Sequence, residues 1–210
     1  NLKTQQDTLD AIRDRLSSGA GFSLCTFNLD HLVKVQNNPA FREAYAKADL
    51  VTADGFPIVK LAKLQKVNLE RVTGADLIHP VCQLAASEKV SVFLFGSNAQ
   101  TLSLCESRLK ALHPGLEIAG TFAPGMGFST SSADAATAVS LIRESRAKLC
   151  FVALGAPRQE LFSAWALNQP TADYDRPEDS LAASHLGSLF GIGRAVLRHR
   201  DAVPDDAKLH

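Results

Sequence analysis

An aspartate, an arginine and a short polar segment are the residues of this chain best suited to chemistry. Asp54 follows an apolar run and precedes Gly55, so its carboxylate could act as a general base on a bound hydroxyl. Aspartate is also favoured at helix N-termini, so a capping role stays open. Arg71 leads into a helix-like run, where its guanidinium could hold a diphosphate through paired hydrogen bonds. A solvent-exposed loop arginine is the alternative.

The polar segment is Gly-Ala-Pro-Arg-Gln-Glu at residues 155–160, directly after an apolar run. Gly155 permits a tight turn, and Pro157 presets the backbone of a first helical turn. The free N–H groups of that turn would face outward toward an anion. Gln159 and Glu160 would exchange hydrogen bonds with a sugar or a base. Polar residues on a first helical turn are also common by chance, so a purely structural role stays open.

A second turn of this kind, Gly-Ser-Asn at residues 96–98, follows the apolar run at 90–95. It would bind a nucleotide phosphate or ribose, or serve as an ordinary strand-to-helix turn. Thr73 precedes another helix-like run and has Asp76 at capping-box spacing, with Asp where the box usually has Glu. Each of these polar groups therefore stands where a helix is expected to begin.

The elements that must position these residues alternate between strands and helices. Strands are expected at residues 22–27, 49–53, 90–95, 116–122 and 149–154, with a further strand-like run at 186–196. Helices are expected at residues 8–16, 39–48, 57–64, 74–87, 99–112 and 133–145. This alternation predicts a doubly wound, mostly parallel α/β sheet of the Rossmann-like type, with helices on both faces. Ligands bind such sheets at the carboxyl ends of the strands, where the polar groups lie.

Composition narrows the class of protein. Apolar residues make up 46% of the 210 residues, enough for a full core, and Lys+Arg and Asp+Glu are equal at 22 each, which argues against a general nucleic-acid binder. The four cysteines form no C-x-x-C pair and lie in apolar runs, as reduced core cysteines do. No apolar run approaches the length of a membrane span. Because the chain starts at Asn1 rather than Met, we expect its natural start to lie upstream, and an upstream anchor stays open.

Five segments, in order, resemble the motifs of the WecG/TagA/CpsF family of bacterial glycosyltransferases. They are T-F-N at 26–28, A-D-G at 53–55, R-V-T-G-A-D at 71–76, F-G-S at 95–97 and G-A-P-R-Q-E at 155–160. The resemblance covers about residues 2–165. It implies the inverting transfer of a hexose, an N-acetylhexosamine or its uronic acid from a UDP-sugar to a polyprenyl-diphosphate-linked sugar. The enzyme would be cytoplasmic and peripheral at the inner face of the bacterial cell membrane, serving surface or exopolysaccharide biosynthesis.

The resemblance also implies roles for single residues. Asp54 would be the base, Arg71 would hold the acceptor or donor phosphates, and Gln159 and Glu160 would contact the donor. The implied catalytic residues are Asp54, Arg71 and Asn28, and the implied substrate- or nucleotide-binding residues are Thr26, Gly55, Thr73, Gly74, Asp76, Gly96, Ser97, Gly155, Pro157, Arg158, Gln159 and Glu160. No metal and no cofactor is expected, and the Asp-x-Asp at 173–175 is interpreted as part of a solvated loop.

The C-terminal part departs from the family pattern. We expect one α/β domain over residues 1–197, with an exposed loop at 169–184 and a polar tail at 198–210. Leu197 stands where the family has an aspartate, and the basic, apolar appendage of the family is not recognisable. Arg194, Arg198 and Arg200 are candidates for the arginine that this appendage would supply. An incomplete active site, in a truncated or altered chain, therefore stays open.

Two other functions stay open beside the transferase. A nicotinamide-dependent oxidoreductase would need a G-x-G-x-x-G turn, whereas the pairs Gly125-x-Gly127 and Gly191-x-Gly193 both lack the third glycine. A nucleotide-binding protein of the same fold without transferase activity is the second alternative. The histidines show no zinc-motif spacing. The donor sugar, the polymer and the choice between monomer and homo-oligomer are not fixed by the sequence.

Overall fold

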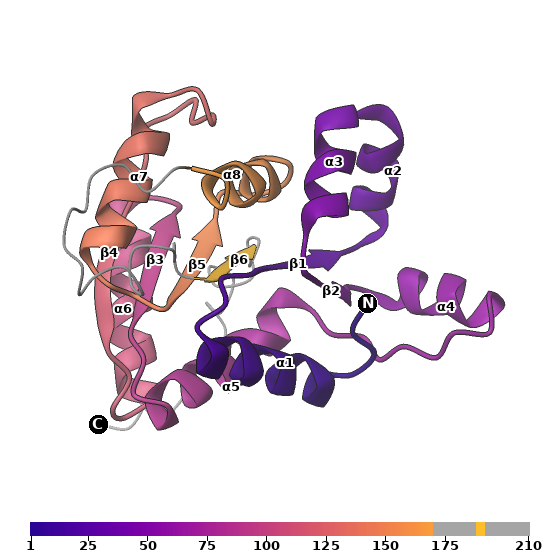
Figure 1. Cartoon of the computed structure of the whole chain (residues 1–210), viewed down its shortest axis with the longest axis horizontal. Helices are drawn as coiled ribbons and strands as arrows, with labels where there is room; N and C mark the ends of the chain where they lie inside the picture. The colour runs from indigo at the N-terminus through magenta and orange to yellow at the C-terminus, as the bar shows by residue number, and fades with distance from the viewer. Residues whose placement is uncertain (170–187, 192–210) are drawn as a thin grey trace, which may run out of the picture.

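A single parallel sheet organises the molecule. The computed structural model describes residues 1–169 and 188–191 (Figure 1). In the described part the sheet has six strands in the order β2-β1-β6-β5-β3-β4, and each neighbouring pair is parallel. The strands are β1 (Ser23–Phe27), β2 (Leu50–Ala53), β3 (Val92–Gly96), β4 (Ile118–Phe122), β5 (Leu149–Ala153) and β6 (Ser188–Gly191). The predicted Rossmann-like α/β sheet is confirmed.

Helices cover both faces of this sheet (Figure 1). They are α1 (Gln5–Ser18), α2 (Leu29–Asn37), α3 (Pro39–Lys47), α4 (Phe56–Leu64), α5 (Gly74–Ser87), α6 (Ala99–Leu112), α7 (Ala133–Glu144) and α8 (Arg158–Ala166). Helices α1, α5 and α6 lie on one face, and α7 and α8 lie on the other, where α3 packs beside α8. None of the helices in the described ranges is both long and apolar enough to cross a membrane.

The core is divided into two layers by the alternation of side chains along the strands. In β3, Leu94 joins a cluster with α1, α5 and α6, whereas Phe93 and Phe95 join a cluster with α7 and α8. Successive strand residues point to opposite faces, and both faces are covered, so the strand is apolar throughout. The sheet is therefore packed against helices on both faces.

Helix starts follow the capping residues closely. Thr73 and Asp76 form a complete capping box at α5: the Thr73 hydroxyl accepts the Asp76 N–H at 3.1 Å, and the Asp76 carboxylate accepts the Thr73 N–H at 3.2 Å. Asp76 thus completes the capping box in place of the usual Glu. Helix α1 begins three residues before the expected start, because Thr4 and Asp7 form the same box.

The C-terminal predictions are tested only in part. The strand-like run at 186–196 contains β6, which lies between β1 and β5 in the middle of the sheet. The remainder of that run, residues 170–184 of the loop expected at 169–184, and the polar tail at 198–210 lie outside the described residues. The arginines at 194, 198 and 200 and the Asp-x-Asp at 173–175 lie there too.

Candidate functional site

A cleft of about 940 Å³ opens at the carboxyl edge of the sheet. Its wall includes residues at the end of, or directly after, five of the strands, β1 to β5, together with the first turn of α5. Several of the predicted site residues line it: Thr26, Asn28, Asp54, Thr73, Gly74, Ser97, Gly155, Arg158 and Gln159. The others, Gly55, Arg71, Asp76, Gly96, Pro157 and Glu160, do not form its wall. The topology thus brings together residues more than a hundred positions apart.

Asp54 lies at this edge with its carboxylate held in place. The Thr26 hydroxyl donates to Asp54 Oδ2 at 3.2 Å, and the Asp54 N–H donates to the Phe27 carbonyl at 2.8 Å. Burial raises the pKa of the Asp54 carboxyl, and the hydrogen bond from Thr26 opposes that rise. The N-cap of α4 is Gly55, which has no side-chain cap, so Asp54 does not cap that helix. Its carboxylate therefore stays available to a ligand.

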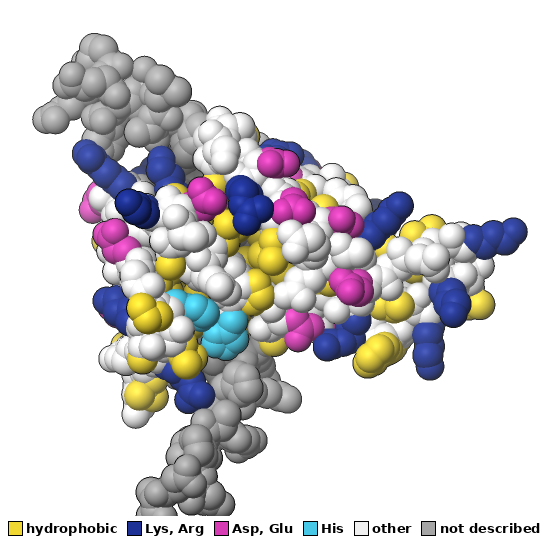
Figure 2. All heavy atoms as spheres, turned by 90° about the horizontal axis from the view of Figure 1, so that it is seen from below, with side chains coloured by type: hydrophobic (Ala, Val, Ile, Leu, Met, Phe, Trp, Pro, Cys, Tyr) yellow, Lys and Arg dark blue, Asp and Glu magenta, His cyan; other side chains and the backbone are white. Residues whose placement is uncertain are grey.

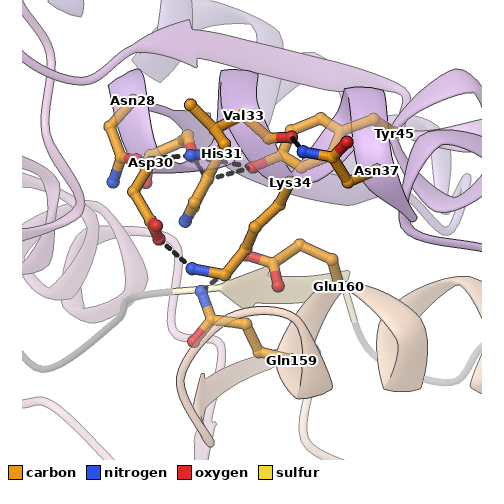
Figure 3. Close-up of polar contacts among 10 residues, drawn as sticks. Asn28, Asp30, His31, Val33, Lys34, Asn37, Tyr45, Gln159 and Glu160 are labelled. Carbon is orange, nitrogen blue, oxygen red and sulfur yellow. Dashed lines mark hydrogen bonds and ion pairs between the residues drawn. The ribbon is translucent and has the colours of Figure 1, made fainter.

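Asn28 has a structural role that the sequence did not specify. Its Oδ1 accepts the His31 N–H at 3.0 Å, which makes Asn28 the N-cap of α2 (Figure 3). The residue also lines the cleft, so its side chain borders the space that a substrate would fill. The predicted catalytic role of Asn28 stays a prediction, and the cap supplies a second reason for an asparagine at this position.

His31 is a cleft residue whose environment sequence reasoning missed. Its Nδ1 lies 3.0 Å from the Thr26 carbonyl and 2.6 Å from the Tyr45 hydroxyl, which itself donates to that carbonyl at 2.9 Å. A carbonyl only accepts, so this network assigns the proton to Nδ1 and leaves Nε2 as an acceptor. Figure 3 shows the second ring nitrogen pointing away from Tyr45. Burial lowers the pKa of His31, which favours the neutral ring.

Arg71 stands beside the cleft rather than on its wall. Its Nη1 lies 3.2 Å from Asp76 Oδ2, and its Cζ lies 5.5 Å from the ring centre of Phe56. The side chain is 37% exposed, so the ion pair is weak and the guanidinium is open to solvent. Asp76 is held by the α5 capping box, so this pair fixes Arg71 near the helix N-terminus. The predicted contact with phosphates stays a prediction.

The turn at residues 155–160 differs in detail from the expected one. Helix α8 begins at Arg158, so Pro157 is its N-cap and not part of its first turn. Gly155, at φ +74°, donates its N–H to Gln159 Oε1 at 3.1 Å, and its carbonyl accepts the Gln159 N–H at 3.2 Å. We expected the N–H groups of this turn to be free to face an anion. That expectation is wrong for the N–H of Gln159, because it is hydrogen-bonded to the Gly155 carbonyl within the turn.

Glu160 lies behind Gln159 and is 2% exposed. Gln159 donates from Nε2 to Glu160 Oε1 at 2.9 Å, whereas Glu160 Oε2 has no hydrogen-bond partner among the described residues. Burial is the main cause that raises the pKa of Glu160 to about 7. Figure 3 shows the Lys34 side chain running toward Asp30, with which it forms an ion pair, beside the Gln159–Glu160 pair. Gln159 is just as buried, at 2% exposed, so burial does not separate the two residues; only Gln159 forms part of the cleft wall.

The turn after β3 shows why glycine is needed there. Gly96 has φ +117°, and a Cβ at this position would lie 2.6 Å from the backbone of Ala153. Ser97 follows at φ +54° and lines the cleft beside Asn98, whose Oδ1 accepts the Thr101 N–H at 2.9 Å and caps α6. Residues 123–126 and Phe128, after β4, form a further part of the cleft wall.

The described residues contain no cluster of three or more His, Cys, Asp or Glu side chains that could hold a metal ion. Independence from metals and cofactors stays a prediction. The four cysteines are free; three are buried and Cys105 is half-buried.

A comparison with protein families gives the same assignment as the motifs. The model of the glycosyl transferase WecG/TagA/CpsF family matches residues 1–172. The chain belongs to this family. A similar protein of Bacillus spizizenii, named N-acetylglucosaminyldiphosphoundecaprenol N-acetyl-beta-D-mannosaminyltransferase, is 30% identical over 148 residues. That match covers 70% of this chain and 55% of the relative, so the chain spans about half of the relative's length.

In this WecG/TagA/CpsF family member, all the motif segments that carry the resemblance contribute to one cleft. The segments at 26–28, 53–55, 71–76, 95–97 and 155–160 each supply at least one lining residue. Parallel strands place their carboxyl ends at a common edge, which explains why motifs so far apart in sequence meet.

Proposed function

We propose that this chain transfers a sugar from a UDP-sugar to a polyprenyl-diphosphate-linked sugar, with inversion at the anomeric carbon, in bacterial surface or exopolysaccharide biosynthesis. The observation that carries the proposal is the Asp54 carboxylate, oriented by Thr26 in a cleft built from the family's motifs and not used as a helix cap. The name of the Bacillus spizizenii relative, which specifies a diphosphoundecaprenol-linked sugar, supports the class of acceptor.

In the proposed reaction, Asp54 removes the proton from the acceptor hydroxyl as that oxygen attacks the anomeric carbon of the donor. The bond between the anomeric carbon and the diphosphate oxygen breaks on the opposite side, and UDP leaves with the electron pair. A carboxyl with a raised pKa is a stronger base than an ordinary aspartate. The hydrogen bond from Thr26 leaves Oδ1 of the same carboxylate for the substrate.

The negative charge on the departing UDP requires hydrogen-bond donors or positive charge at the cleft. The first turn of the 14-residue helix α5 lines the cleft through Thr73 and Gly74, and a helix N-terminus favours an anion. Arg158 lines it as well, and Arg71 stands beside it. We assign the start of α5 and Arg158 to the phosphates of UDP, Arg71 to the diphosphate of the acceptor, and Gln159 to the sugar or base of the donor. The reaction then needs no metal for charge neutralisation, and the enzyme would act at the cytoplasmic face of the membrane.

The direct test is product formation from a panel of UDP-sugars with a short-chain polyprenyl-diphosphate-linked sugar as acceptor. The proposal predicts UDP release that requires the acceptor, and a product whose new glycosidic bond has the inverted configuration by NMR. UDP binding without acceptor-dependent release from any donor would contradict it and favour a nucleotide-binding protein of the same fold.

A further inference from the structure

Helix α4 and the residues after it expose an unusual amount of apolar surface. Four of the nine exposed large hydrophobic side chains in the described ranges lie within residues 56–67: Phe56 is 66% exposed, Leu61 44%, Leu64 78% and Val67 42%. None of the residues of α4 is buried. A helix that is apolar on most sides is normally covered by protein or by lipid.

The position of α4 in the fold leaves it open to a partner. Figure 1 shows α4 projecting sideways from the sheet beyond β2, one of its two edge strands in the described part. Figure 2 shows hydrophobic and Lys or Arg side chains gathered on the corresponding projection at the right of the molecule. Other helices, such as α5 and α8, bury several residues each.

The charged side chains of residues 56–67 indicate which kind of partner would bind there. Residues 56–67 contain Lys60, Lys63 and Lys66 and no acidic residue. Among the ion pairs of the described residues, lysines 34, 47 and 110 take part, whereas these three have no acidic partner. Leu61 and Leu64 are three positions apart and share one side of the helix, with Lys60 and Lys63 beside it. Apolar residues bordered by lysines are the pattern of helices that lie in a lipid interface.

We propose that residues 56–67 dock on an anionic lipid surface, with Leu61 and Leu64 in the boundary between headgroups and acyl chains and the lysines at the lipid phosphates. A second copy of the chain is a poorer occupant, because a symmetric contact would place three lysines opposite three lysines. An anionic membrane satisfies both the apolar side and the charge.

This docking surface would bring the membrane to the reacting groups, a point that rests on the proposed function. Asp54 stands two residues before α4, and the Arg71 guanidinium lies 5.5 Å from the ring centre of Phe56, the first residue of the helix. A diphosphate carried by a lipid in that surface would reach Arg71 while its sugar enters the cleft beside Asp54. The helix therefore links the lipid anchor of the acceptor to the base.

The test is flotation of the 210-residue chain with vesicles of phosphatidylglycerol and phosphatidylcholine, compared with phosphatidylcholine alone. We expect binding to the anionic vesicles that weakens with salt, and at least about tenfold weaker partitioning for Leu61→Gln with Leu64→Gln. The matched control is Leu104→Gln with Leu112→Gln, which removes two leucines of similar exposure from α6 and should bind like the parent. Thermal denaturation checks that both variants fold.

Equal vesicle binding by the α4 variant and the parent, or no binding by the parent, would overturn the proposal. A change in sedimentation of the parent that the α4 variant abolishes, without any effect on vesicles, would overturn it in favour of contact between copies. Vesicle binding needs no donor, so its outcome is separate from that of the transfer reaction. If transfer occurs, the α4 variant should keep it with a short-chain acceptor in solution and lose at least about tenfold with a long-chain acceptor in vesicles.

Discussion

Two carboxyl groups at the carboxyl edge of the sheet, Asp54 after β2 and Glu160 in α8, show how burial separates their uses. Burial raises the pKa of both groups. Asp54 is half-buried, lines the cleft and is held by one hydroxyl, whereas Glu160 is enclosed and receives its hydrogen bond from Gln159. The carboxylate of Asp54 can contact a substrate, whereas that of Glu160 holds Gln159, which forms part of the cleft wall. Residue type alone would have given both the same role.

The largest effect is expected at Asp54. Asp54→Asn keeps the shape and removes the base, so the rate of transfer should fall by about 10²–10⁴-fold while UDP binding and the melting temperature change little. Asp30→Asn is the control, because Asp30 also lines the cleft but is an exposed carboxylate paired with Lys34. Equal losses in the two variants would show that cleft charge, rather than proton removal, is what Asp54 supplies.

The ionisation of Glu160 should affect the free energy of unfolding rather than the rate of sugar transfer. Its pKa is raised from 4.5 to about 7, so its stabilising contribution is fully present below pH 4.5 and is lost as the pH rises through about 7. The loss should amount to roughly 3 kcal/mol, from about 1.4 kcal/mol for each pKa unit. Urea denaturation at several pH values measures it. Glu160→Gln should flatten that part of the curve, and an unchanged slope in the variant would assign the effect to another group.

Substitution of Arg71 should weaken ligand binding with little effect on stability. Because its ion pair with Asp76 is part-exposed, Arg71→Gln should change the free energy of unfolding by less than about 1 kcal/mol. Loss of a charge-assisted contact to phosphate should raise KM about tenfold. Arg108→Gln, an exposed arginine on α6, is the control and should alter neither quantity. A strongly destabilised Arg71→Gln protein would mean that the residue is structural.

The smallest effect is expected for the cap at Asn28. Asn28→Ala should cost about 1 kcal/mol of stability, because the His31 N–H loses its acceptor, and Asn28→Ser should restore most of it. Thermal denaturation of both variants measures this. If Ser restores activity together with stability, the cap explains the residue. Activity that stays low in Asn28→Ser would support the predicted catalytic role.

The parts of the fold and the site that depend on residues close together in the sequence could be predicted from local patterns. The alternation of strands and helices predicted the parallel sheet, and Thr73 predicted the start of α5 at Gly74. Asp54 could be placed at the strand ends because it directly follows the apolar run of β2. These features are set by residues within a few positions of one another.

Features that depend on distant packing could not be predicted in this way. The ring of His31 is oriented by Tyr45, 14 residues away in another helix, and Glu160 is buried where α8 packs beside α3. The place of β6 between β1 and β5 depends on a crossover that no short motif encodes. The exposure of α4 likewise depends on how the rest of the chain packs, which no local pattern in the sequence encodes.

The pH dependence of kcat/KM for the parent and for Glu160→Gln tests the central claim most directly, because this quantity reports the ionisation of the free enzyme. The account assigns the acidic limb to Asp54, so the limb should lie above the range of an ordinary aspartate and be the same in both proteins. A limb near pH 7 that disappears in Glu160→Gln would make Glu160 the controlling group and contradict the assignment of Asp54 as the base.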